Sequence, residues 1–168
     1  PLYAYFLAFS HLITGGNLLL IAMIQLTIDV LLCFLIYYTG KILYNEWAGI
    51  IAAGLSIFYR TSIVYAATVL SDSLIYFLYI LFIMLVYYSL QKPNFIRWVI
   101  TGILLGLSAL AKPTIAIFLP FFLVGLYVYP EKKFLPVDIK EKFQPLVIFF
   151  IVLIISGMVI LPITIRNY

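Results

Sequence analysis

Charged residues are scarce in this sequence, and cysteine and histidine are almost absent. Charged residues make up 10% of the 168 positions, against roughly 25% in an ordinary soluble domain. Because 66% of the residues are hydrophobic, a water-soluble globule of this length could not bury its apolar surface. Cys33 is the single cysteine, which excludes an internal disulfide and a thiolate metal cluster. The composition therefore excludes soluble enzymes and nucleic-acid-binding domains.

Long apolar runs take the place of the missing polar residues. At about 20 apolar residues per bilayer crossing, the chain has room for about five to seven helical spans. The first stretch, residues 1–17, is short, aromatic and closed by two glycines, which predicts an interfacial helix at the outer surface. We therefore expect an all-α polytopic membrane protein with a single transmembrane domain over residues 1–168. Its six predicted membrane segments cover residues 18–38, 47–59, 72–90, 98–111, 113–129 and 145–165.

The fourth and fifth segments are separated by a predicted break at Lys112. A single helix over residues 98–129 would be about 48 Å long, although the hydrocarbon core of a bilayer is only about 30 Å thick. Pro113 disfavours helical geometry at the residue before it. Two short passes that meet at Lys112 therefore fit the membrane better than one long helix.

The basic residues between the segments predict the orientation of the chain in a cell membrane. Cytoplasmic loops carry an excess of lysine and arginine. With six alternating segments, seven basic residues fall on one side and three on the other, and the polar loop of residues 130–144 belongs to the richer side. That side is predicted to be cytoplasmic, which places both ends of the chain outside. The seven residues are Lys41, Lys92, Arg97, Lys132, Lys133, Lys140 and Lys142.

The outer side collects a small set of polar residues at the ends of several segments. Three are cations, Arg60, Lys112 and Arg166, and one is a carboxylate, Asp72. Ionisable groups at membrane depth are costly and indicate a functional site. Three cations beside one carboxylate suit an anionic ligand, such as a phosphate held at the lipid surface.

Structural explanations exist for several of these residues. Asp72 begins a segment, where a carboxylate caps free backbone amides and complements the helix dipole. Arg166 lies at a segment end, from which a long side chain reaches the headgroups. His11, on the same side, fits an interfacial aromatic residue better than a catalytic base.

A competing hypothesis starts from Asp29, near the centre of the first segment, with Gln25 one turn before it. A buried intramembrane carboxylate marks a proton or ion path in a transporter or channel. It also serves as structural support by pairing with a polar group on a neighbouring helix. Because no second charge lies in the middle of a segment, the structural role is favoured.

Two pairs of small residues predict close contacts between helices. Gly102 with Gly106, and Gly49 with Ala53, each place two small residues one helical turn apart. Such ridges let membrane helices approach closely and are not diagnostic of a function.

Four short motifs follow one another along almost the whole chain. They are Pro1-Leu2-Tyr3 with Phe6-Leu7-Ala8, Val69-Leu70-Ser71-Asp72-Ser73-Leu74, Gly102-x-x-x-Gly106-Leu107-x-x-Leu110-Ala111-Lys112-Pro113-Thr114, and Pro162-x-x-x-Arg166-Asn167-Tyr168. In this order and spacing they resemble the membrane core of the GT-C glycosyltransferases. The resemblance is greatest to the family of dolichyl-phosphate-mannose protein mannosyltransferases and bacterial aminoarabinose transferases.

The resemblance implies an inverting sugar transfer on the extracytoplasmic side of the membrane. The donor would be a polyprenyl-phosphate-linked sugar, and the acceptor a glycan, a lipid or a protein. Asp72 matches the second acidic position of the family, which in some relatives helps to place a metal ion or the acceptor, so a divalent cation is a candidate cofactor, although the sequence does not identify one. Lys112 and Arg166 match basic positions that would neutralise the departing lipid phosphate.

The same resemblance predicts that the chain is an internal piece of a longer protein. Members of the family carry an acidic pair in the first outer loop, just upstream of the position where this chain begins. No such pair and no charged leader precedes Pro1 in this sequence. We therefore expect the piece to be inactive in sugar transfer by itself.

Overall fold

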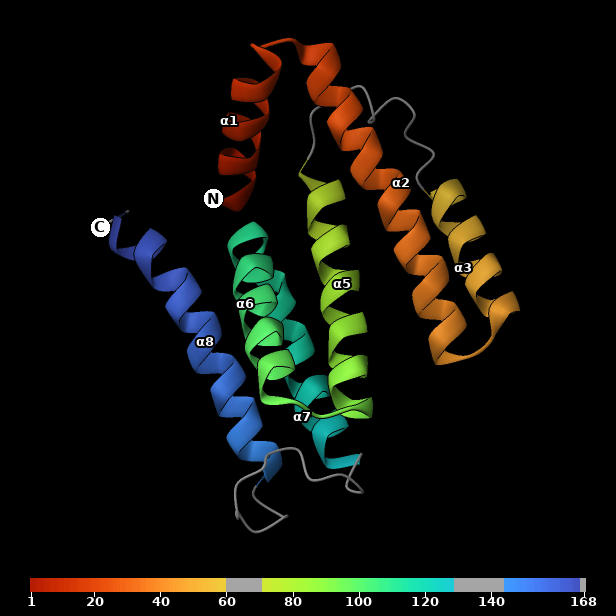
Figure 1. Ribbon diagram of the computed structural model, residues 1–168, viewed down its shortest axis with the longest axis vertical. Helices are drawn as coiled ribbons and strands as arrows, with labels where there is room; N and C mark the ends of the chain where they lie inside the picture. The colour runs from red at the N-terminus through yellow and green to blue at the C-terminus, as the bar shows by residue number, and fades with distance from the viewer. Residues whose placement is uncertain (60–70, 129–143, 167–168) are drawn as a thin grey trace. The chain divides into compact units, whose positions relative to one another are not determined.

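The computed structural model describes residues 1–59, 71–128 and 144–166, and within these ranges the chain forms helices and no strand (Figure 1). Three helices, α2, α5 and α8, are long and apolar enough to cross a membrane, and the other helical stretches are shorter and apolar. The predicted all-helical membrane class is confirmed, and the count of six segments stays a prediction. In chain order the elements are α1 (Leu2–Thr14), α2 (Leu18–Leu43), α3 (Glu46–Tyr59), α5 (Asp72–Gln91), α6 (Phe95–Ala111), the 3-10 helix η1 (Pro113–Ile117), α7 (Phe118–Val128) and α8 (Gln144–Arg166).

The contacts divide the chain into two compact units, Pro1–Leu81 and Phe82–Tyr168. The boundary falls inside α5, so the first half of this helix belongs to the first unit and the second half to the second unit.

A glycine pair reverses the chain between α1 and α2 in the first unit. Gly15 and Gly16 have φ angles of 60° and 83°, in the left-handed region that glycine adopts without steric cost. The side chain of Asn17 then caps the first turn of α2. Beyond the turn, the Gln25 side-chain amide donates a hydrogen bond to the Tyr3 hydroxyl at 2.9 Å. This hydrogen bond holds α1 against the first half of α2.

Close backbone contacts join α2 and α3. A Cβ atom on Gly49 would lie 2.5 Å from the carbonyl oxygen of Tyr37, and one on Gly40 would lie 2.9 Å from the Cα atom of Gly49. Further along the pair, the Ser56 hydroxyl lies 3.8 Å from the Cys33 sulfur. These three contacts fit one antiparallel register. The close helix packing predicted at Gly49 is thus confirmed.

Helix α2 is longer than the predicted segment, since it ends at Leu43 and not at Tyr38. Thr39 lies within this helix, and its hydroxyl donates to the carbonyl of Leu35 in the preceding turn. Gly40, which lies beyond the predicted segment, provides part of the contact surface for α3. The turn that follows α2 therefore begins at Tyr44, later than the sequence predicts.

In the second unit, a polar turn joins α5 to α6. The Asn94 side chain caps α6 by accepting a hydrogen bond from the amide of Ile96. The Arg97 guanidinium donates to the carbonyl of Lys92 at 2.6 Å and so satisfies a free carbonyl just beyond the end of α5. These bonds hold the two helices in a hairpin.

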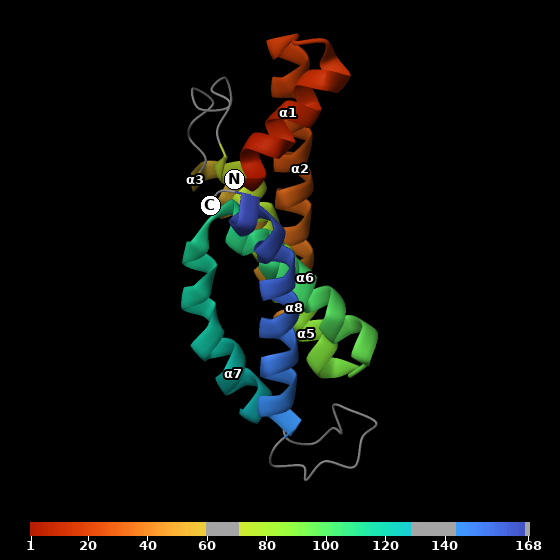
Figure 2. The same ribbon diagram turned by 90° about the vertical axis from the view of Figure 1, so that its left-hand side faces the viewer.

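Helices α6 and α8 pack against each other in parallel through the predicted Gly102–Gly106 ridge. A Cβ atom on Gly102 would lie 2.8 Å from the Cβ of Ile155, and one on Gly106 would lie 2.8 Å from the Cβ of Val159. Four residues separate the partners in each helix, which fixes a parallel register. Helix α7 runs in the opposite direction, as Figures 1 and 2 show. The small residues therefore do what their spacing predicts and bring the helices into contact.

Aromatic rings from four helices meet at Phe122 of α7. Its ring centroid lies 6.3 Å from those of Phe82 and Trp98 and 6.0 Å from that of Phe149. Phe122 and Trp98 are both buried. This cluster forms the centre of the second unit and holds α6 and α8 in place around α7.

Candidate functional site

Lys112 lies at a break between two helices, as the sequence predicts. Its backbone is extended, with φ of −155° and ψ of 120°, and it separates the end of α6 from η1, which begins at Pro113. Proline disfavours helical geometry at the preceding residue, which explains the break. The amide of Lys112 donates to the carbonyl of Ser108 at 2.9 Å. The side chain is exposed, so the break presents a cation at the surface of the second unit.

Arg166 lies in the last turn of α8 and is also exposed. The parallel register of α6 and α8 relates this residue to Lys112. Lys112 follows Gly106 by six residues, and Arg166 follows the contact partner Val159 by seven. The two cations therefore lie at the same end of the helix pair.

Both cations lie where a helix dipole favours positive charge. The C-terminal turn of a helix carries free carbonyl groups and a partial negative charge. Helices α6 and α8 run in the same direction, so their negative ends point the same way. This field stabilises Lys112 and Arg166 even without a ligand. It also makes their positions compatible with a purely structural role.

Asp72 begins α5, as predicted, and is partly buried. The carbonyl of Ser71 accepts the first helical hydrogen bond, from the amide of Ile75 at 3.2 Å. In the first turn a carboxylate faces the positive end of the helix dipole. Asp72 belongs to the first unit, whereas Lys112 and Arg166 belong to the second.

Arg60, the third predicted outer cation, lies outside the described residues, and so does most of the predicted cytoplasmic loop. Gln144, the last residue of that predicted loop, is buried at the start of α8. The roles assigned to these segments stay predictions.

The residues of the competing hypothesis lie in the first unit. Gln25 is buried and engaged with Tyr3 of α1, so it serves as an interhelical link. Asp29 is partly buried one turn further along α2. His11 is exposed in the last turn of α1, and its imidazole lies against Gly16 in the α1–α2 turn. These placements favour structural and interfacial roles for the polar groups of α1 and α2.

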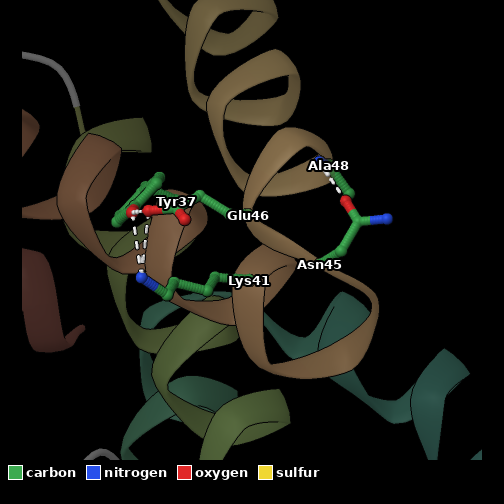
Figure 3. Close-up of polar contacts among 5 residues, drawn as sticks. All are labelled: Tyr37, Lys41, Asn45, Glu46 and Ala48. Carbon is green, nitrogen blue, oxygen red and sulfur yellow. Dashed lines mark hydrogen bonds and ion pairs between the residues drawn. The ribbon is translucent and has the colours of Figure 1, made fainter.

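A polar cluster that is not predicted from the sequence lies between α2 and α3 (Figure 3). The Tyr37 hydroxyl and the Lys41 ammonium both donate to Glu46 Oε1 at 3.1 Å. The Lys41 nitrogen also lies 5.8 Å from the centre of the Tyr37 ring. The hydrogen bond from Lys41, and then that from Tyr37, hold the pKa of the Glu46 carboxyl below its usual value. Tyr37 and Lys41 are one helical turn apart, which is the only sequence signal for this cluster.

Metal ligands do not gather anywhere in the described ranges. Over residues 1–59, 71–128 and 144–166, no group of three or more His, Cys, Asp or Glu side chains could hold a metal ion. Among these residues, Asp72 is therefore not part of a group that could hold a metal ion.

Most of the chain matches a known protein family. No curated protein and no solved structure matches the chain. The family described as dolichyl-phosphate-mannose-protein mannosyltransferase matches residues 1–161. The match includes the start of α5, the break at Lys112 and α8 as far as Leu161, so Arg166 lies beyond it. The chain therefore belongs to the dolichyl-phosphate-mannose-protein mannosyltransferase family, a group of membrane glycosyltransferases of the GT-C type.

Proposed function

We propose that the protein transfers a sugar from a polyprenyl-phosphate-linked donor to an acceptor on the extracytoplasmic side, and that Lys112 and Arg166 hold the donor phosphate. The observation that carries this proposal is the parallel packing of α6 and α8, which brings both cations to one end of the second unit. Two cations at one end of a membrane helix pair suit a phosphate at the lipid surface.

The proposed chemistry follows from the charge that develops during transfer. As the bond between the sugar and the phosphate breaks, negative charge grows on the departing phosphate oxygens. Cations that are already in place stabilise this charge without reorganising during the reaction. Arg60 would add a third positive charge to the same phosphate. Asp72 would help to place the acceptor or a divalent cation, since the alternation of the predicted segments puts it on the same face of the membrane.

The transporter hypothesis receives less support from the structure. It requires polar groups that are available in the middle of a membrane segment. Gln25, one of its two polar groups, is buried and bonded to α1. The family match independently favours a glycosyltransferase.

The proposed donor can be tested with membranes that contain the full-length protein. A labelled sugar attached to polyprenyl phosphate should be transferred to acceptor, because the site supplies cations for a lipid phosphate at the membrane surface. The same sugar attached to a soluble nucleotide should give no product unless a polyprenyl phosphate and an enzyme that charges it are also present. Product formed by the purified protein from the nucleotide sugar alone would contradict the proposal.

The proposed sidedness leads to a labelling prediction in the full-length protein with Cys33 replaced by alanine. A cysteine at Thr114, beside Lys112, should react with a membrane-impermeant maleimide in intact cells. A cysteine at Asp138, in the predicted cytoplasmic loop, should react only after the cells are opened. The reason is the seven-to-three division of basic residues between the two predicted sides. External labelling of position 138 would overturn the six-segment topology.

A further inference from the structure

The turn between α2 and α3 carries features of a contact surface for lipid headgroups. Tyr44 and Trp47 are 82% and 73% exposed, and they flank the turn at the end of a helix long enough to cross the membrane. Exposed tyrosine and tryptophan at the end of such a helix are typical of the headgroup level of a bilayer. Lys41 and Glu46, on either side of the same turn, form an ion pair at 3.1 Å that is itself largely exposed.

The hydrogen bonds inside this cluster leave one donor and one acceptor for a ligand. Tyr37 and Lys41 both donate to Oε1 of Glu46, so neither of them uses Oε2. A lysine ammonium has three N–H groups, and the contacts of Lys41 with Glu46 and Tyr37 use two of them. Figure 3 shows the three side chains directed toward one another. The cluster thus has one remaining N–H group and one remaining carboxylate oxygen.

This combination is selective for a particular headgroup. A free ammonium N–H suits a phosphate oxygen, and a free carboxylate oxygen suits an ammonium group. A phosphoethanolamine headgroup carries both groups close together. A phosphocholine headgroup has the same charges but no N–H group to donate, and a phosphoglycerol headgroup has a phosphate but no cation.

We infer that the α2–α3 turn binds a phospholipid with an ethanolamine headgroup, with the phosphate at Lys41 and the ammonium at Glu46. The exposed rings of Tyr44 and Trp47 hold the turn at the depth where this headgroup lies. The acyl chains then extend along the apolar surface of α2. This lipid site is distinct from the proposed donor site at Lys112 and Arg166, and it does not depend on the side of the membrane that the turn faces.

Lipid binding to the purified full-length protein tests the inference. The protein is titrated in detergent with ethanolamine, choline or glycerol phospholipids that have identical acyl chains, and bound lipid is counted by native mass spectrometry. The ethanolamine lipid should be retained roughly tenfold more strongly than the choline lipid, because only its ammonium donates charge-assisted hydrogen bonds. Glu46→Gln should remove this difference, and Lys41→Gln should weaken retention of both lipids.

A matched control is available at the turn between α5 and α6. Lys92 is an exposed cation there, and no carboxylate lies in the sequence of that turn. Lys92→Gln should therefore leave the preference for the ethanolamine headgroup unchanged. Glu46→Gln preserves side-chain shape at an exposed position, so an unchanged elution profile will show that the variant remains folded.

Three results would overturn the inference. They are equal retention of ethanolamine and choline lipids by the unmodified protein, an ethanolamine preference that survives Glu46→Gln, and stronger retention of the glycerol lipid than of the ethanolamine lipid. None of these measurements involves a sugar donor. Their outcome is therefore independent of the proposed sugar transfer.

Discussion

Replacing Lys112 with alanine in the full-length protein should lower the rate of sugar transfer by about 100- to 1,000-fold, the usual cost of removing one preorganised electrostatic contact. The loss should appear mainly in turnover and less in the binding of the donor. This follows because only interactions that are stronger in the transition state than in the ground state accelerate the chemical step. Arg166→Ala should behave in the same way, since its position at the end of α8 parallels that of Lys112 at the end of α6.

A matched control separates the local site from a general loss of positive charge. Lys92→Ala also removes an exposed lysine, from the α5–α6 turn at the opposite end of α6. This variant should retain nearly full transfer activity. All three variants should insert and accumulate normally, because the side chains that they remove are exposed. Full activity of both Lys112→Ala and Arg166→Ala would show that the phosphate site lies elsewhere.

The parts of the fold that the sequence predicts well depend on local chemistry. Pro113 favours extended geometry at Lys112 whatever the surrounding tertiary structure. The break between α6 and η1 therefore follows from two adjacent residues. The Gly102–Gly106 spacing likewise predicts close packing, because a helical turn brings the two small residues onto one face. Each of these predictions needs only a few neighbouring residues.

Features that depend on helix pairing could not be predicted in the same way. The bond between Gln25 and Tyr3 exists because the α1–α2 turn places two distant residues in register. The Tyr37, Lys41 and Glu46 cluster depends on α2 continuing to Leu43, beyond its predicted end. The predicted alternation of segments already makes α6 and α8 parallel, but the contacts of Gly102 with Ile155 and of Gly106 with Val159 come from the structure. Hydrophobic pattern alone identifies helices but not which faces meet.

The helix contact at Gly106 should be a sensitive position for the stability of the second unit. A Cβ atom there would lie 2.8 Å from the Cβ of Val159 and 2.9 Å from the carbonyl oxygen of Ser156. Neither atom is the flexible end of a side chain, so the helices must separate to admit a methyl group. Gly106→Ala should therefore lower the free energy of unfolding by about 1–3 kcal/mol, the usual cost of overpacking. Thermal unfolding of the purified full-length protein measures this change.

Gly157→Ala provides the comparison within the same helix pair. A Cβ atom on Gly157 of α8 would have no atom within 4 Å, so alanine there should be neutral or slightly stabilising through its better helix propensity. The contact at Gly106 also bears on the spacing of Lys112 and Arg166. Gly106→Ala should therefore reduce sugar transfer at temperatures at which the variant is still folded, whereas Gly157→Ala should not. Equal unfolding temperatures for the two variants would contradict the close α6–α8 contact. Because that contact is the basis for placing both cations at one end of the helix pair, the same result would also remove the structural support for the donor site.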